Sequence, residues 1–248
     1  MGGQRFLTMK RAWINDDCVE VGLDEAGRGP LWGRLYVGAV VMAPEDDAYF
    51  DGGAVLRQIT DSKKLTPRRR AVLRDYIQDT AIATAVTWAD PTEIDAVNVL
   101  QADLNAMHRA LDTIWKEECI PFQRILVDGD TWRPWRDPES GAEVPGIKIV
   151  EGDASVLSIA AASILAKEAH DEWVRTTVAA EQLLSERYGL DRNMGYGTAA
   201  HMAGLKTWGA HALHRRSFAP VRAVVTPESV APVKGPLFRY TGGASSLH

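Results

Sequence analysis

Apolar residues recur along the chain in two different spacings, which separate the predicted strands from the predicted helices. Short, continuous apolar runs bounded by glycine, proline or charged residues are typical of buried strands. Longer segments with an apolar residue at every third or fourth position are typical of helices with one buried face. The short runs predict strands at 21–24, 35–43, 82–88, 124–128 and 147–150.

The helical spacing predicts four main helices. Pro67 follows Thr66, a residue suited to cap a helix, so we expect a helix over 67–80. A longer amphipathic helix is expected over about 98–119. An alanine-rich helix is expected from Asp153 to about 167, or as far as 186, and another over 198–207. Because strands come first and then alternate with helices, the chain predicts an α/β fold.

The pattern also predicts how the chain is divided. Residues 1–18 are expected to form a loose N-terminal extension and residues 19–222 one domain with a helical C-terminal part. Residues 223–248 are rich in Pro, Gly and Ser, which is typical of a partly disordered tail. Residues 131–146, rich in Pro, Gly and Trp, predict an excursion or long hairpin loop.

Acidic residues stand where two predicted strands end. Asp24 and Glu25 follow the first strand and lead into the turn 27–29, and Asp128 ends the strand 124–128. If these strands are neighbours, their carboxyl ends converge at the edge where α/β sheets hold ligands. Adjacent carboxylates there favour a divalent cation between them. The alternative is a surface loop with two solvated acids.

Charge and cysteine content narrow the class of protein. The net charge of −5 means that no global positive field attracts nucleic acid, so such a partner must be held by local patches. Cys18 and Cys119 lack metal-ligand spacing and are expected to be buried thiols in a reducing compartment. We see no leader peptide, and the longest apolar run is too short for a bilayer, so we expect a soluble, cytoplasmic protein.

Two local stretches are basic, although such runs are as often only solvated faces. If they bind nucleic acid, they would contact its phosphate backbone without reading sequence. The first comprises Lys63, Lys64, Arg68, Arg69 and Arg70, and the second His201, Lys206, His211, His214, Arg215 and Arg216.

Six blocks in order resemble ribonuclease HII, the type 2 ribonuclease H family, and the resemblance covers about residues 20–222. It implies a ribonuclease H-like mixed five-stranded sheet flanked by helices, with a helical C-terminal portion. The blocks are Asp-Glu-Ala-Gly-Arg-Gly-Pro at 24–30, Asp-Ser-Lys-Lys-Leu at 61–65, Leu-Val-Asp-Gly at 126–129, 152–153 with 161–167 and Asp171, 195–198 with His201, and 214–218.

The resemblance implies that Asp24, Glu25, Asp128 and Asp153 are the catalytic metal ligands. For Asp153 the alternative is a helix N-cap. Four oxygen donors without a His or Cys pattern select a hard cation, Mg²⁺ or Mn²⁺. Two such ions could activate water and stabilise a leaving oxygen. Asp171 lies about 27 Å from Asp153 if the helix between them is straight, so it is not included.

The resemblance also implies the substrate contacts. Gly27, Arg28 and Gly29, with Tyr196, would read the ribonucleotide through its 2′-hydroxyl, and Lys63 would contact a phosphate. The alternatives are that Tyr196 only packs over a glycine turn and that Arg28 forms a structural salt bridge. The expected partners are RNA–DNA hybrids and duplex DNA that contains ribonucleotides.

The function expected from the resemblance is an endonuclease that cuts 5′ to ribonucleotides, leaves 3′-hydroxyl and 5′-phosphate ends, and removes misincorporated ribonucleotides and RNA primers. The alternatives are a nucleic-acid-binding relative without activity and another metal-dependent nuclease of the same fold. The family suggests a monomer. Residues 236–238, Pro-Leu-Phe, resemble in part a tail motif that contacts sliding clamps.

At five positions the chain departs from residues common in the family. Glu151 stands where Lys is more frequent, His170 where Arg is common, and Met194 where polar or basic residues are common. Trp32 and Arg34 replace a small residue and Pro, and there we expect local repacking.

Overall fold

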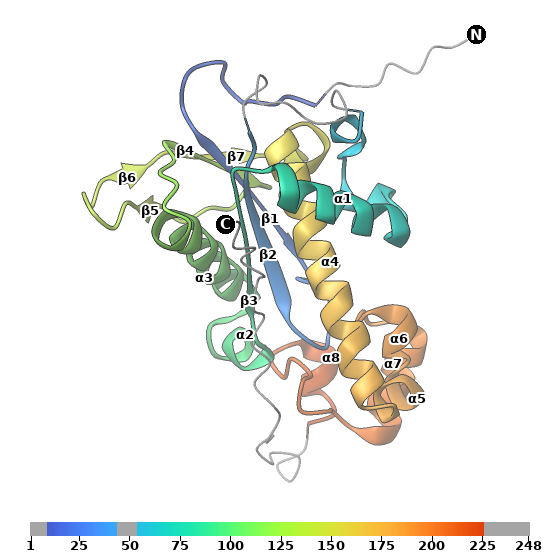
Figure 1. Ribbon diagram of the computed structural model, residues 1–248. Helices are drawn as coiled ribbons and strands as arrows, with labels where there is room; N and C mark the ends of the chain where they lie inside the picture. Colours follow the sequence, from blue (N-terminus) through green and yellow to red (C-terminus); the bar gives the residue numbers. More distant parts are fainter. Residues whose placement is uncertain (1–8, 44–53, 226–248) are drawn as a thin grey trace.

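The centre of the protein is a mixed sheet of five strands, seen in a computed structural model that describes residues 9–43 and 54–225 (Figure 1). The strand order is β3-β2-β1-β4-β7. β1 pairs antiparallel with β2 and β2 with β3, whereas β1–β4 and β4–β7 are parallel. The predicted sheet is therefore confirmed. The strands are β1 (Glu20–Ala26), β2 (Leu35–Val41), β3 (Ala83–Ala89), β4 (Arg124–Asp128) and β7 (Gly146–Ile149).

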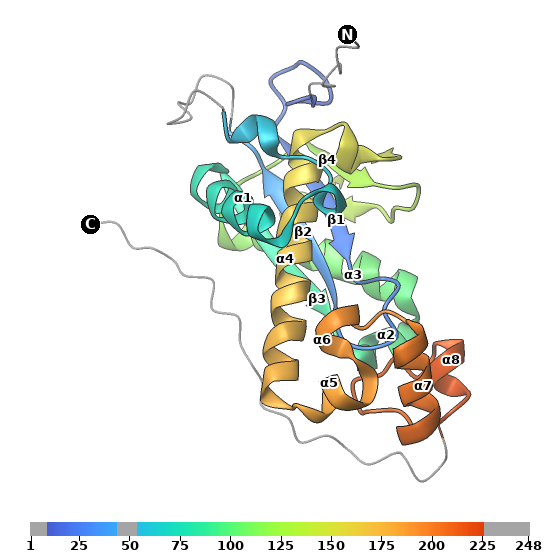
Figure 2. The same cartoon turned by 90° about the vertical axis from the view of Figure 1, so that its right-hand side faces the viewer.

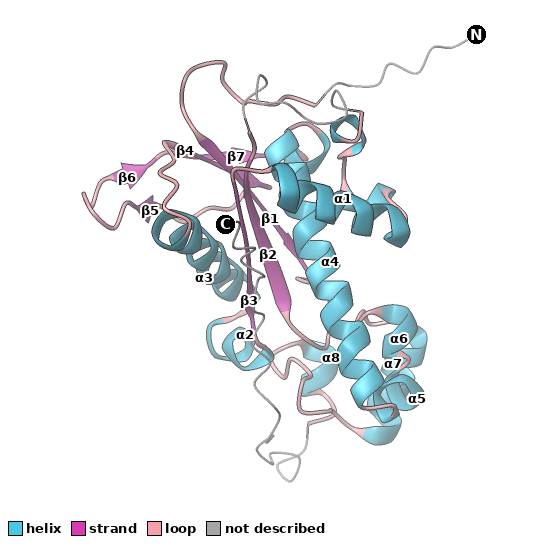
Figure 3. Cartoon of the chain, in the orientation of Figure 1, coloured by secondary structure: helices cyan, strands magenta, loops and turns pink. Residues whose placement is uncertain are grey.

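Helices cover both faces of this sheet (Figure 3). α4 (Leu157–Ala180) and α1 (Pro67–Thr80) lie on one face, and α3 (Val99–Asp112) and α2 (Pro91–Val97) on the other. Each face has its own apolar core. Thr66 caps α1 by accepting a hydrogen bond from the Arg69 N–H, as its position before Pro67 predicted.

α4 packs unusually close to the sheet because glycines face it. A Cβ at Gly22 would lie 2.4 Å from the backbone carbon of Ser158, and one at Gly38 would lie 2.3 Å from the Ala162 carbonyl oxygen. Only glycine allows strand and helix backbones to approach this closely. The small residues of α4 therefore serve tight packing, as its alanine-rich sequence indicated.

The start of α4 differs from the prediction. Asp153 lies in a short 3₁₀ helix, η4 (Gly152–Ala154), and α4 begins only at Leu157. Val156 holds the N-cap position and provides no side-chain cap. Asp153 therefore does not cap α4, which removes the structural alternative for this residue.

The predicted helix over 98–119 is broken into two conformations. α3 begins after Asn98, whose φ of 69° separates it from α2 and whose side chain accepts from the Gln101 N–H. After Asp112 the helix continues as a π-helix, η3 (Thr113–Glu117). The predicted excursion is a hairpin of β5 (Trp135–Arg136) and β6 (Glu143–Val144).

Short helices gather around the C-terminal half of α4 (Figure 2). Trp32, in the turn between β1 and β2, is fully buried among apolar residues of α4, α5 and α6. The helices are α5 (Leu183–Tyr188), α6 (Leu190–Asn193), α7 (Ala199–Trp208) and α8 (Ala219–Arg222).

The remaining segments bear on other predictions. Lys10 pairs with the start of α4, where its N–H donates to Ser155 and its carbonyl accepts from Leu157. Residues 226–248, with the segment 236–238, lie outside the described residues.

Cys18 and Cys119 are free thiols, but Cys18 is only half-buried and Cys119 is exposed, so their predicted burial was wrong. Within the described ranges, no helix combines the length and apolarity needed to cross a bilayer.

Candidate active site

Three acids meet at one edge of the sheet because of its strand register. β1 and β4 pair with Leu23 opposite Val127, so the next residues, Asp24 and Asp128, lie side by side. Asp128 also holds the turn after β7, because its Oδ1 accepts from the Gly152 N–H at 2.7 Å and the Asp153 N–H at 3.4 Å. Asp153 is thereby placed beside the other two carboxylates.

Glu25 approaches this edge from the opposite face. Successive side chains of a strand point to opposite sides. Gly22 packs against α4, so Asp24 faces α4 as well. Leu23 belongs to the core on the α3 side, so Glu25 faces α3. There its Oε1 lies 3.2 Å from Nη1 of Arg28. The two adjacent acids are thus divided between the two faces of the sheet.

The electrostatics show how closely the acids influence one another. Burial raises the pKa of Asp24 well above its usual value, and the charges of Glu25 and Asp128 raise it further. Burial likewise raises the pKa of Asp153 to about 6, with added repulsion from Asp128 and Asp61. Burial lowers the pKa of Lys63, but attraction to Asp153 and the neighbouring acids outweighs it and raises that pKa overall.

The donor set suits a hard divalent cation. All candidate ligands are carboxylate oxygens that repel one another, and such sets bind Mg²⁺ or Mn²⁺ in preference to softer metals. Across residues 9–43 and 54–225, no three His, Cys, Asp or Glu side chains already stand in a complete ligand arrangement. The assignment of Asp24, Glu25, Asp128 and Asp153 as ligands therefore remains a prediction.

The turn after β1 is held open by a buried arginine. Gly27 has a φ of +89°, which favours glycine. Arg215 is fully buried, and its guanidinium donates to the carbonyls of Gly27 at 2.6 Å, Arg28 at 3.0 Å and Gly33 at 2.9 Å. Burial lowers the pKa of Arg215 to about 10, so it stays charged at neutral pH.

Two rings lie against this turn from different sides. A Cβ at Gly29 would be 3.4 Å from Cε1 of Tyr196, whose side chain remains 43% exposed beside the site. A Cβ at Gly27 would be 2.6 Å from Cδ2 of His170, which is fully buried. Tyr196 therefore stays accessible to a ligand, whereas His170 supports the turn from below.

Lys63 is held toward the acids by a buried ion-pair network. Arg70 donates to the carbonyls of Ser62 and Leu65 and pairs with Glu168 at 2.8 Å and Asp171 at 3.1 Å. This fixes the loop of η2 (Ser62–Lys64) against α4. Arg70 is thus not part of an exposed basic patch. Asp171 pairs with Arg70 and Lys167, and its exclusion from the ligand set stays a prediction.

The second basic stretch is also largely internal. His201, His214 and Arg215 are buried, so they do not form a phosphate track as predicted. His201 Nδ1 lies 3.0 Å from the Tyr196 carbonyl and must donate to it. His201 Nε2 then accepts from His214 Nε2 at 2.9 Å. The histidines join the turn of Tyr196 to the rest of the C-terminal helices.

The remaining departures from the family pattern are accommodated locally. Arg34 pairs with Asp90 at 2.7 Å, and its guanidinium lies over the rings of Trp88 and Trp173. Glu151 is exposed and has a φ of 54°. Met194 also adopts a left-handed conformation, with a φ of 49°.

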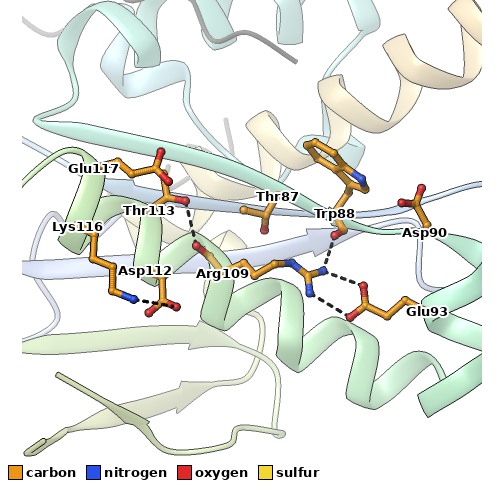
Figure 4. Close-up of a pocket in the computed structure, with 9 residues that line it drawn as sticks. All are labelled: Thr87, Trp88, Asp90, Glu93, Arg109, Asp112, Thr113, Lys116 and Glu117. Atoms are coloured by element: carbon orange, nitrogen blue, oxygen red, sulfur yellow. Dashed lines mark hydrogen bonds and ion pairs between the residues drawn. The ribbon is translucent and has the colours of Figure 1, made fainter. Parts of the chain in front are cut away.

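One hollow lies away from the acids. It has a volume of about 570 Å³ and is formed by β3, α3 and η3 (Figure 4). Its charged walls are mostly paired with one another: Arg109 binds Glu93 and the Trp88 carbonyl, and Lys116 lies near Asp112. Because these groups satisfy each other, we do not place the active site there.

Three residues that lie near the acids were not predicted from the sequence to belong to the site. Asp61 lies against Asp153, Arg215 supports the glycine turn, and Asp103 of α3 faces Arg28. Asp61 and Arg215 could have been found from the sequence, because both fall within blocks that resemble the family. Asp103 stands in a helix with no such signal.

Solved structures share this architecture. Ribonuclease H2 from Pyrococcus horikoshii OT3 is 27% identical, with a TM-score of 0.57 over 83% of this chain and 96% of that chain. The ribonuclease HII of the PCNA complex from Archaeoglobus fulgidus is 24% identical, with a TM-score of 0.56 over 79% and 91%. Bst-RNase HIII with Mn²⁺, 20% identical with a TM-score of 0.56 over 84% and 69%, shows the same fold. The fold and its acidic edge therefore define a ribonuclease H-like nuclease.

The family follows from the sequence comparisons. Residues 21–221 match the family described as ribonuclease HII. Ribonuclease HII of Neisseria meningitidis serogroup C is 39% identical over 84% of this chain and 96% of its own length, and that of Dechloromonas aromatica is 41% identical over 81% and 90%. The chain belongs to the ribonuclease HII family. It is a metal-dependent endoribonuclease that acts on RNA–DNA hybrids.

Proposed function

We propose that the protein hydrolyses the phosphodiester on the 5′ side of ribonucleotides, both in RNA–DNA hybrids and at single ribonucleotides in duplex DNA. The observation that supports this most is the position of the glycine turn. The turn continues directly from Asp24 and Glu25, and Tyr196 lies against it. A 2′-hydroxyl bound at the turn would be held next to the carboxylates.

Each residue then has a definite task. Asp24, Glu25, Asp128 and Asp153 would hold the cation, Mg²⁺ or Mn²⁺, which when bound supplies activation of water and stabilisation of the leaving oxygen. Lys63 would offset the charge of the scissile phosphate. The turn would orient the sugar through its backbone groups, and Tyr196 would pack against that sugar.

The reaction needs no covalent protein intermediate. Water attacks the phosphorus, and the bond from the phosphorus to the 3′-oxygen of the preceding nucleotide breaks. That oxygen takes up a proton and becomes a 3′-hydroxyl, and the ribonucleotide keeps the 5′-phosphate. The corresponding cellular role is removal of misincorporated ribonucleotides and RNA primers by a monomer. A contact of residues 236–238 with a sliding clamp stays a prediction, although the related Archaeoglobus protein was solved with PCNA.

A labelled DNA duplex that carries one ribonucleotide tests the activity. We expect cleavage at that site with Mg²⁺ or Mn²⁺, none with EDTA, and a loss of at least about a hundredfold in Asp128→Asn, because this change removes a ligand charge. Binding without cleavage in either metal would favour a non-catalytic relative. Equal cleavage of an all-DNA duplex would favour a nuclease without ribose recognition.

Tyr196→Ala tests the proposed reading of the sugar. The ring contacts the turn, so we expect its removal to lower the cleavage rate at a single ribonucleotide by about tenfold or more while duplex affinity changes less, since misplacement costs rate. Tyr196→Phe is the control, because it retains the ring. Equal losses of rate and affinity in Tyr196→Ala would contradict this role.

A further inference from the structure

Asp103 is a buried acid on α3 that touches the proposed site from the side of Glu25. Its side chain is 2% exposed, and its Oδ2 lies 3.5 Å from Nε of Arg28. Its Oδ1 is buried and has no hydrogen-bond partner among the described residues. A half-satisfied carboxyl in such a place destabilises the fold, so its presence needs an explanation.

Asp103 is one of the residues that line a small hollow beside the acids. This hollow has a volume of about 30 Å³ and is lined on its polar side by Glu25, Arg28, Asp128 and Asp130. A space of this size holds a single water-sized group. Asp103 therefore lies at the same opening as two of the proposed metal ligands, although it comes from a different layer of the fold.

Arg28 is shared between two carboxylates. Its Nη1 lies 3.2 Å from Oε1 of Glu25 and its Nε lies 3.5 Å from Asp103, while 44% of its side chain remains exposed. A guanidinium and one carboxylate tend to close into a bidentate pair. Asp103 opposes that closure, because it draws the Nε side of the guanidinium toward α3.

We propose that Asp103 is a positioning residue that holds Arg28 away from a closed pair with Glu25. Glu25 then keeps an oxygen for the cation, and Arg28 keeps its exposed N–H groups for the sugar-phosphate backbone of the substrate. This inference rests on the proposed function, since it assigns Asp103 to the same site. Burial and the charge of Glu25 raise the pKa of Asp103 well above its usual value, and the charge of Arg28 only partly offsets this.

Asp103→Leu is the main test, because leucine has a similar shape and cannot bind Arg28. We expect affinity for the single-ribonucleotide duplex, measured by fluorescence anisotropy in EDTA, to fall about tenfold, as expected when preorganisation is lost. Mn²⁺ binding, measured by calorimetry without substrate, should weaken about threefold or more, because Arg28 then competes for Glu25. Asp103→Asn, which keeps an acceptor, should restore most of the duplex affinity.

Two controls separate positioning from general effects. Asp130→Asn removes a charge from the same hollow without breaking an ion pair to Arg28, so it should alter both affinities by less than about twofold. In an Arg28→Met background, Asp103→Leu should have no further effect on either affinity, because the residue it acts through is gone. Urea unfolding of each variant checks that the fold is retained.

The outcomes are distinct. Unchanged duplex and Mn²⁺ affinities in Asp103→Leu, or equal losses with and without Arg28, would overturn the role of Asp103. Losses that require Arg28 would establish it. A wild-type protein that fails to cleave the duplex would contradict the proposed function alone, because the effect of Asp103 on Mn²⁺ binding is measured without substrate or turnover.

Discussion

At the scale of single residues, the proposed site is supported from within the fold by buried charged side chains. Arg215 is the clearest case, since it is fully buried and its guanidinium donates to three carbonyls of one turn and to no carboxylate among the described residues. Carbonyl groups at a buried turn must find donors. Arg215 therefore determines the backbone shape that the ribose would meet.

Arg215→Lys is expected to disturb this turn. Lysine has one ammonium group and cannot reach three carbonyls in a fixed plane, so we expect a loss of about 2 kcal/mol of unfolding free energy and about tenfold or more in cleavage rate. Chemical denaturation and single-turnover cleavage measure the two effects. The same exchange at Arg222, in the last turn of α8, is the control and should change neither. Full activity in Arg215→Lys would contradict the assignment.

Sequence alone identified the residues that lie within short, ordered motifs. Asp24, Glu25 and Asp128 could be placed at one edge because each stands where an apolar run ends. The role proposed for Asp103 could not be predicted, because it arises only when α3 packs on the face of the sheet opposite α4. Asp153 was placed near the site, but its local conformation was missed since a 3₁₀ turn and a helix start share the same sequence signals.

At the scale of elements, the C-terminal helices are joined by histidines that must stay neutral. His214 Nδ1 accepts from the His211 N–H at 2.8 Å, and its Nε2 donates to His201. His211 Nδ1 accepts from the indole N–H of Trp32 at 3.2 Å. A second proton on His214 would face a donor, so protonation and this arrangement exclude each other.

This network predicts that acid weakens the C-terminal part. Burial, with repulsion from His201 and His211, lowers the pKa of His214 to about 3. In the unfolded chain its pKa is about 6.5, so between these values the unfolded state binds more protons and the stability falls as the pH falls. The expected loss is about 1.4 kcal/mol per pH unit below about pH 6.

The buried acids near β1 have raised pKa values, so their protonation stabilises the fold as the pH falls, which opposes the effect of His214. The test therefore compares wild type with a variant that lacks His214. The free energy of unfolding of wild type minus that of His214→Asn, measured by urea at several pH values, should shrink between about pH 6.5 and pH 5 by about 2 kcal/mol. A difference that stays constant with pH would show that His214 is not held neutral.

At the scale of the whole molecule, a chain of negative net charge presents a local positive surface beside its acids. Lys63, Lys64 and Arg68 are exposed in η2 and at the start of α1, whereas Arg70 is used internally. The composition predicted that nucleic acid must be held locally, but could not tell exposed cations from buried ones. Only the packing of α1 against α4 makes that distinction.

Lys63→Gln is expected to change how binding depends on salt. If Lys63 contacts a phosphate, the slope of log affinity against log salt should decrease in magnitude by about 1 between about 50 and 200 mM salt. Lys116→Gln, in η3 on the α3 side, is the matched control and should leave the slope unchanged. An identical slope in Lys63→Gln and wild type would exclude a phosphate contact at this position.

α4 supports the proposed site along its whole length, because different parts of the site pack on different turns of this helix. Its first turns support β1 and β2, its middle holds Arg70 and the glycine turn, and its end packs on Trp32. Inserting one residue into a helix rotates everything beyond it by about 100° and moves it by about 1.5 Å. The length of α4 between Ser158 and Val174 is therefore fixed by geometry, and we expect lineages that carry this enzyme to vary in its loops but not in that span.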